Sequence, residues 1–203
     1  MKKFVWPLFL FLIFAFSTGL LAYGWWLLRI EKGNLALSQG ETETAAKLYE
    51  AAEGPFRRAP WLGQILRDDY QRLIFRQVHI LYAKGKNDEA IEKLEQATAT
   101  APFLAQSGEY SFWTGNLLFR QAVQTKDPET SVNALKAALS EYQKGLAAEP
   151  DDWDLKYNYE LVNYIFSQRE RDKKKEQQKV KSILDKMRPV EPSREQLAPE
   201  KRG

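Results

Sequence analysis

The chain has 203 residues, and its 30 basic and 27 acidic side chains give a net charge of only +3 at pH 7. This near balance does not indicate a nucleic-acid-binding protein, which would need a strongly basic surface. The sequence contains no cysteine, so disulfides, thiolate metal sites, thiol catalysis and a lipidated cysteine are all excluded.

The N-terminus holds a long apolar run, MKKFVWPLFLFLIFAFSTGLLAYGWWLLRI. Residues 4–28 are uncharged, and a helix of this length slightly exceeds the roughly 30 Å hydrocarbon core of a bilayer. Trp6 lies at one end and Trp25 and Trp26 at the other, where interfacial aromatic residues are common. We therefore predict a membrane anchor over residues 4–28, in a unit of residues 1–30 that includes a short cytoplasmic stub.

The charges beside this run predict its orientation. A cleavable signal peptide is the alternative, with AFS at 15–17 as its cleavage sequence, but the apolar run continues to Leu28 and favours a retained anchor. Lys2 and Lys3 precede the anchor, whereas the charges just after it nearly cancel. By the positive-inside rule the N-terminus stays in the cytoplasm. In a bacterium this predicts a single-pass inner-membrane protein with residues 31–203 in the periplasm.

A triplet of small, large and small residues at i, i+4 and i+7 recurs in the middle of the chain. The triplets are Ala45, Tyr49 and Ala52; Ala90, Leu94 and Ala97; and Ala138, Tyr142 and Gly145. Small residues at both ends let a neighbouring helix approach closely, while the middle side chain fills the gap. Gly40 and Gly85 precede the first two triplets, and Pro102 and Pro150 follow the last two. The pattern therefore predicts that each unit is a helical hairpin, which must stack on its neighbours to bury its apolar face.

These units resemble the tetratricopeptide repeat, a helix–turn–helix unit of about 34 residues. The resemblance is fullest over residues 71–102, whereas the first repeat has Arg57 in place of the proline and the third has an insertion around TKDPETSVNA. It implies a solenoid of about three to four degenerate repeats over residues 31–166. The first helix of this solenoid would be the outer end of the anchor helix, residues 21–38, with a bend at Gly33.

The C-terminal part of the chain is strongly charged. Residues 167–188 are predicted to form a capping helix, with a basic arm for an acidic partner or the lipid surface as the alternative. Residues 189–203 contain three prolines and no apolar stripe, so we predict disorder there. The predicted fold is thus all-α, with an N-terminal transmembrane helix, a short tetratricopeptide-like helical-hairpin solenoid and a disordered C-terminal tail.

Residues suited to catalysis or to metal binding are few. His79 is the sole histidine, and the sequence has no glycine-rich phosphate loop or nucleophile elbow. The acidic stretch EPDDWD, Glu149 to Asp154, has oxygen ligands for calcium, but its spacing differs from an EF-hand loop. Acidic residues before a helix are commonly N-caps. We therefore predict no enzymatic activity, no cofactor and no metal, with a calcium or metal carrier, or an enzyme, that uses this cluster as the alternative.

The predicted binding surface is an inner face formed by the first helices of successive repeats. Tetratricopeptide arrays bind ligands along this concave face, and the resemblance implies the same for this chain. The residues expected to line it are Arg72, Phe75, His79 and Tyr82; Tyr110, Trp113, Leu117 and Arg120; and Tyr157, Leu161 and Tyr164. Tyrosine, tryptophan and arginine dominate protein-binding hot spots, which favours a protein partner. Burial in the core is the alternative for each aromatic residue.

The chain combines a single anchor, a few degenerate repeats and a charged tail with prolines. This arrangement, together with the stretches FWTGNLLFR and PDDWDLKYNYELV, is similar to MxaK-like tetratricopeptide proteins. These are encoded beside MoxR ATPases and von Willebrand-domain proteins in methanol dehydrogenase maturation clusters. The similarity implies a membrane-anchored adaptor that assists assembly or maturation of a periplasmic enzyme, with von Willebrand-domain proteins as partners. A structural protein that organises the cell envelope through its basic helix is the remaining alternative.

Overall fold

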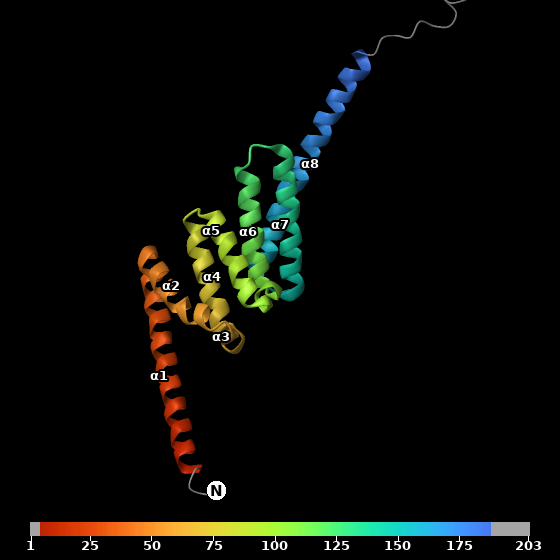
Figure 1. Ribbon diagram of the computed structural model, residues 1–203. Coiled ribbons are helices and arrows are strands. Elements are labelled where there is room, and N and C mark those ends of the chain that lie inside the picture. The colour runs from red at the N-terminus through yellow and green to blue at the C-terminus, as the bar shows by residue number, and fades with distance from the viewer. Residues whose placement is uncertain (1–4, 188–203) are drawn as a thin grey trace, which may run out of the picture.

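The computed structural model describes residues 5–187, and within this range the regular elements are all helices (Figure 1). They are α1 (Val5–Ser38), α2 (Thr42–Arg58), α3 (Trp61–Ile65), α4 (Arg67–Ala83), α5 (Asn87–Thr100), the short 3₁₀ helix η2 (Pro102–Gln106), α6 (Gly108–Gln124), α7 (Pro128–Ala148) and α8 (Trp153–Met187). The all-α fold class is confirmed. The predicted disorder of residues 189–203 lies outside the described residues.

The helices form stacked hairpins, as the triplets predict. α1 pairs with α2, α4 with α5 and α6 with α7, and α8 then packs on α7. Every triplet residue lies on the second helix of a hairpin and is buried. The predicted tetratricopeptide-like solenoid is therefore confirmed.

A buried tyrosine packs on a glycine in the first and third hairpins. A Cβ on Gly33 would lie 2.6 Å from Cε1 of Tyr49, and a Cβ on Gly115 would lie 2.6 Å from Cε1 of Tyr142. Each tyrosine hydroxyl donates to the side chain of the asparagine that follows the glycine, at 2.8 and 2.7 Å. Burial raises the pKa of both phenols, so they remain protonated donors.

The bend expected at Gly33 does not occur, because α1 is one helix from Val5 to Ser38. Gly33 instead allows Tyr49 to approach the backbone of α1 closely. The predicted anchor and the first helix of the first repeat are consequently parts of the same helix.

The insertion in the third repeat lengthens its second helix, since α7 has 21 residues whereas α5 has 14. Only residues 125–127 separate α6 from α7. Asp127 caps α7, since its Oδ2 accepts a hydrogen bond from the backbone N–H of Thr130 at 2.8 Å. Ser131, in the added turn, is buried and donates to the backbone oxygen of Ala122 at 2.6 Å. The added residues thus extend the packing of α7 on α6.

α8 begins within the solenoid and continues beyond it. Leu155 and Val162 are buried against the preceding hairpin, whereas residues 171–183 are exposed. The charged segment predicted as a cap is continuous with this helix and extends away from the packed helices (Figure 1).

α1 is the single helix among residues 5–187 that is long and apolar enough to cross a membrane. No residue in the most apolar stretch of α1 is buried within the protein, whereas the core helix of a soluble domain would be mostly buried. Figure 1 shows its N-terminal part extending away from the other helices.

Candidate partner-binding site

A cleft of about 540 Å³ lies between α1 and α4, the first helices of the first two repeats. α1 contributes Glu31 and Asn34 beside several apolar side chains, and α4 contributes Asp69, Arg72 and Arg76. The cleft therefore combines an apolar wall with two arginines.

Arg72 and Arg76 lie one turn apart on α4, so their side chains share a face of the helix. Arg72 is exposed and Arg76 half-buried, and neither belongs to the ion pairs formed within the described part of the chain. Asp69, one turn earlier, accepts a hydrogen bond from the hydroxyl of Tyr23 at 2.7 Å, which ties α1 to α4. The two guanidinium groups are planar donors well suited to carboxylates.

An aromatic cluster continues this face toward α6. His79 stacks on Trp113 with ring centroids 5.4 Å apart, and Tyr82 and Phe112 meet Trp113 edge-on at 5.6 and 5.2 Å. Trp113 is half-buried, and its Nε1 has no hydrogen-bond partner among the residues that the structure describes. A cluster of aromatic rings, with the indole Nε1 buried inside it, therefore adjoins the arginines.

Arg120 joins the second repeat to the third. Its guanidinium lies 3.5 Å from the ring centroid of Tyr82, and Nη1 donates to the backbone oxygen of Tyr82 and to Oδ1 of Asn87 at 3.3 Å. The guanidinium also lies near the C-terminal end of α4, where a positive charge interacts favourably with the helix dipole. Arg120 thus has a structural role in this arrangement, and its removal would disturb both repeats.

The structure separates the predicted inner-face residues by exposure. Phe75 and Leu117 are each 1% exposed and belong to the core, so these two residues cannot line a surface as predicted. The half-buried residues are Tyr82, Tyr110, Trp113 and Arg120. The exposed residues are Arg72, His79, Tyr157, Leu161 and Tyr164.

The last three of these residues belong to an exposed stripe on α8. Its members are Trp153, Tyr157, Leu161 and Tyr164. Their helical spacing places them on one face, away from the buried Leu155 and Val162. The sequence prediction omitted Trp153, although its spacing from Tyr157 is the same as that of Tyr157 from Leu161.

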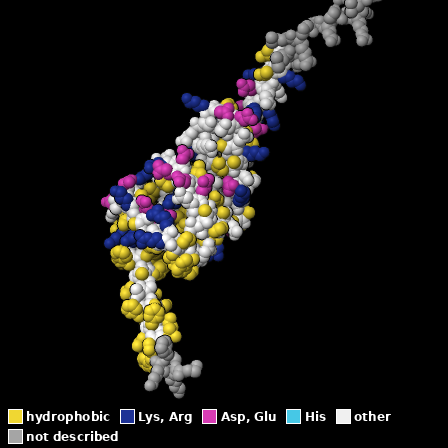
Figure 2. All heavy atoms as spheres, viewed as in Figure 1, with side chains coloured by type: hydrophobic (Ala, Val, Ile, Leu, Met, Phe, Trp, Pro, Cys, Tyr) yellow, Lys and Arg dark blue, Asp and Glu magenta, His cyan; other side chains and the backbone are white. Residues whose placement is uncertain are grey.

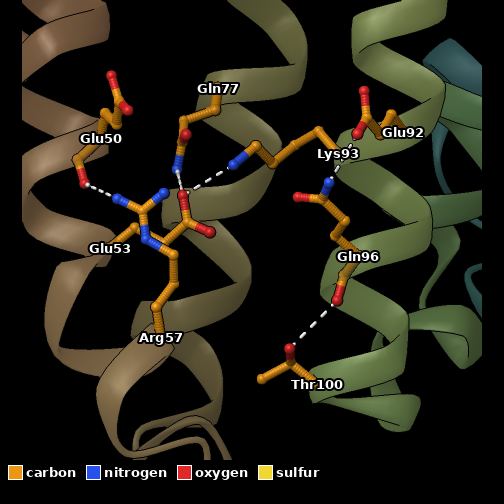
Figure 3. Close-up of polar contacts among 8 residues, drawn as sticks. All are labelled: Glu50, Glu53, Arg57, Gln77, Glu92, Lys93, Gln96 and Thr100. Carbon is orange, nitrogen blue, oxygen red and sulfur yellow. Dashed lines mark hydrogen bonds and ion pairs between the residues drawn. The ribbon is translucent and has the colours of Figure 1, made fainter.

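A buried polar cluster that the sequence did not predict joins α2, α4 and α5 (Figure 3). Lys93 and Gln77 both reach the carboxylate of Glu53, with Nζ and Nε2 at 2.8 and 3.0 Å from Oε2. The side chains of Lys93 and Glu53 are only 16% and 8% exposed. Because the three side chains come from three helices, they connect the first repeat to the second.

The cleft beside this cluster differs from the one between α1 and α4. Both clefts carry charges of both signs, because Glu31 and Asp69 line the first one as well. The second cleft measures about 390 Å³ and is lined by lysines and glutamates. Several of these charges are paired: Lys84 with Glu43, and Lys86 with Glu89 at 2.9 Å. The cleft between α1 and α4, with two arginines outside any such pair, is therefore the better candidate for binding an anionic group.

The acidic stretch of residues 149–154 contributes to the architecture. Oδ1 of Asp152 accepts from the backbone N–H of Leu155 at 2.9 Å and caps α8, while Oε1 of Glu149 accepts from the backbone N–H of Gly108 at 3.1 Å. Within residues 5–187, no group of three or more histidine, aspartate or glutamate side chains is placed to hold a metal ion.

Comparison with known proteins agrees with this architecture. Residues 75–152 match the tetratricopeptide repeat family. No curated protein sequence matches the chain. The chain therefore contains tetratricopeptide repeats, and the part that matches the family covers most of the second hairpin and all of the third.

Similar solved structures share the fold at low identity. The first tetratricopeptide domain of human RPAP3 is 16% identical, with a TM-score of 0.51 over 72% of this chain and 95% of that chain. A thermophilic tetratricopeptide protein of Thermus thermophilus is 16% identical, with a TM-score of 0.56 over 72% and 68%. The first repeat domain of Spaghetti (RPAP3), bound to the HSP90 peptide SRMEEVD, is 17% identical, with a TM-score of 0.50 over 70% and 95%.

Proposed function

We propose that this protein is a membrane-anchored adaptor that binds a segment of a partner protein along the inner face of its solenoid. The observation that carries the proposal is the cleft between α1 and α4, where Arg72 and Arg76 lie outside the ion pairs of the described residues. The aromatic cluster of His79 and Trp113 follows directly along α4 and α6. Tetratricopeptide domains generally serve as non-catalytic scaffolds for protein interaction.

The chemistry of this face favours a partner segment with carboxylates and apolar side chains. Two guanidinium groups on one face of α4 can each form a charge-assisted, bidentate hydrogen-bond pair with a carboxylate. The neighbouring half-buried aromatic rings supply apolar contact area for an anchor side chain. The peptide bound by the similar RPAP3 domain, SRMEEVD, is itself acidic, which supports the same type of ligand here.

The site of action that we propose is the periplasmic face of a bacterial inner membrane. Residues 4–28 would anchor the chain, with the N-terminus in the cytoplasm and the solenoid outside it. There the adaptor would assist assembly or maturation of a periplasmic enzyme, with von Willebrand-domain proteins as partners. The exposed apolar part of α1 and the lysines before it support this orientation.

Partner capture by the solubilised full-length protein tests the proposal. Arg72→Ala/Arg76→Ala is compared with the control Arg171→Ala/Lys174→Ala, which removes two charges from the exposed part of α8. We expect the first variant to keep its helical circular dichroism and to lose captured protein by about tenfold or more, because it removes two charge-assisted contacts. Full capture by this variant, combined with loss on deletion of residues 171–203, would assign binding to the basic helix.

A further inference from the structure

The short helix α3 exposes apolar side chains at one end of the solenoid. Trp61 and Ile65 are 62% and 68% exposed, while Leu62 and Leu66 are half-buried against the core. Figure 1 shows α3 at the end of the solenoid toward which α1 extends, and Figure 2 shows hydrophobic side chains gathered around this end. The feature thus lies beside the proposed membrane anchor.

α3 and α1 face each other across an apolar cleft of about 380 Å³. α1 contributes Gly19, Ala22 and Trp26 to the lining, α3 contributes Trp61 and Ile65, and no charged side chain takes part. The exposed surface of α3 is therefore continuous with the apolar surface of α1.

Contacts of α1 with its neighbours hold this arrangement in place. Nε1 of Trp26 donates to the backbone oxygen of Ala52 at 2.8 Å, and its ring meets Phe56 edge-on at 5.7 Å. Tyr23 stacks on Trp26 at 5.9 Å and donates to Asp69. The solenoid therefore cannot move away from the outer part of α1 without breaking these contacts.

The length of α1 sets the depth of this region in a bilayer. At 1.5 Å per residue, Gly19 and Trp26 lie about 21 and 32 Å along the helix from Val5. A span that begins at Val5 would leave the hydrocarbon core, about 30 Å thick, between these two residues. Because α3 lines the same cleft as that stretch of α1, it would then lie at the outer boundary of the bilayer.

Basic residues flank α3 on both sides. Arg57 and Arg58 end α2, Arg67 begins α4, and all three are exposed. The sequence has no acidic residue from Gly54 to Arg67. An exposed tryptophan with aliphatic neighbours and adjacent arginines has the composition of segments that bind at the membrane interface.

From this geometry we infer that α3 inserts into the headgroup and upper acyl region of the same bilayer that α1 spans. Trp61 and Ile65 lie among the acyl chains, and the flanking arginines contact lipid phosphates. The surface binds lipid because it continues the lipid-facing surface of α1 at the same depth. This inference rests on the proposed anchoring by α1, and it is independent of partner binding on the inner face.

The absence of native cysteine allows a direct test with single labels on the full chain. Ile65→Cys, Trp61→Cys, Phe14→Cys and Lys126→Cys are each labelled with an environment-sensitive fluorophore. The labelled proteins are reconstituted in vesicles of phosphatidylcholine and phosphatidylglycerol with brominated acyl chains. Position 14 reports on the anchor, and position 126, in the loop between α6 and α7 at the far end of the solenoid, is the aqueous control (Figure 1). The mutated side chains at positions 61, 65 and 126 are exposed, so these substitutions spare the core.

The inference predicts that the labels at positions 61 and 65 emit at shorter wavelength and lose most of their intensity to the brominated lipid. The label at 126 should instead be quenched by aqueous iodide. Iodide quenching at 61 and 65 with lipid quenching at 14 would overturn the inference and leave the anchor intact. Protection of 61 and 65 from both quenchers would mean that protein covers α3, which also overturns it. Absence of lipid quenching at 14 would refute the anchor and the inference together.

Discussion

Replacing Lys93 with methionine should destabilise the junction between the first two repeats. Lys93 reaches Glu53 at 2.8 Å in a region where the two side chains are 16% and 8% exposed. Lys93→Met keeps much of the apolar stem of the side chain but leaves the Glu53 carboxylate without its counterion. Gln77 would still donate to that carboxylate, at 3.0 Å in the native protein.

The size of the effect follows from the cost of an unpaired buried charge. Removing one partner of a buried ion pair costs about 3–5 kcal/mol. Because Gln77 still donates, we expect about 3 kcal/mol, which corresponds to a loss of about 6–12 °C in Tm for a domain of this size. The double variant Glu53→Gln/Lys93→Met removes both charges and keeps an acceptor for Gln77, so it should recover most of that loss.

Thermal unfolding of the full chain in detergent, followed by far-UV circular dichroism, measures these differences. Lys86→Met is the matched control, because the ion pair of Lys86 with Glu89 has a similar length, 2.9 Å, but is half exposed. Such exposed pairs contribute little to stability, because solvent screens the charges. If Lys93→Met and Lys86→Met lower Tm equally, or if the double variant is no more stable than Lys93→Met, the buried pair does not join the repeats as described.

Three further predictions concern packing, pH and topology. Gly33→Ala places a Cβ 2.6 Å from Tyr49 and should lower the free energy of unfolding, measured by chemical denaturation, by about 1–3 kcal/mol. In the control Gly54→Ala the new Cβ has nothing within 4 Å, so this change should stabilise α2 by about 0.5–1 kcal/mol. Equal effects of the two substitutions would contradict the close contact. Hydrogen bonds from Thr130 lower the pKa of Asp127, so the stability that this carboxylate contributes is present above its unfolded pKa of about 3.9 and is lost as the pH falls through its folded pKa. The Tm advantage of the native chain over Asp127→Asn should therefore be clear at neutral pH and vanish in strong acid, and a constant difference would exclude this linkage. Alkaline phosphatase fused after residue 203 should be active and the native N-terminus retained, while an N-terminus near residue 18 would indicate cleavage.

The local periodicity of the sequence was sufficient to predict the hairpins. In the triplet around Tyr142, for example, the small residues on either side of the tyrosine indicate that another helix packs closely there. This pattern lies within one helix, so it can be recognised from the sequence alone. The same reasoning could not predict the role of Gly33, because a glycine in a helix indicates a bend and a close contact equally well. The position of Tyr49 on the facing helix decides between them.

The candidate site was predicted less completely than the fold. Arg72 and His79 are exposed as expected, but Leu117 turned out to be buried, because the rotation of α6 depends on how it packs against α4 and α5. Arg76 was missed, although it lies one turn after Arg72. The pair of Glu53 and Lys93 was missed as well, since charged helical residues normally predict a solvent-exposed face.

The central claim, that the inner face of the solenoid binds a partner protein, is tested most directly by site-specific photo-crosslinking in native membranes. A photoreactive residue replaces Arg72 or His79 on the inner face. In the control it replaces Glu92, which is exposed on α5, the second helix of its hairpin, and so does not belong to the inner face formed by first helices. Crosslinked proteins are identified by mass spectrometry. We predict that positions 72 and 79 crosslink the same protein and that position 92 does not. Crosslinks from position 92 alone would contradict the claim.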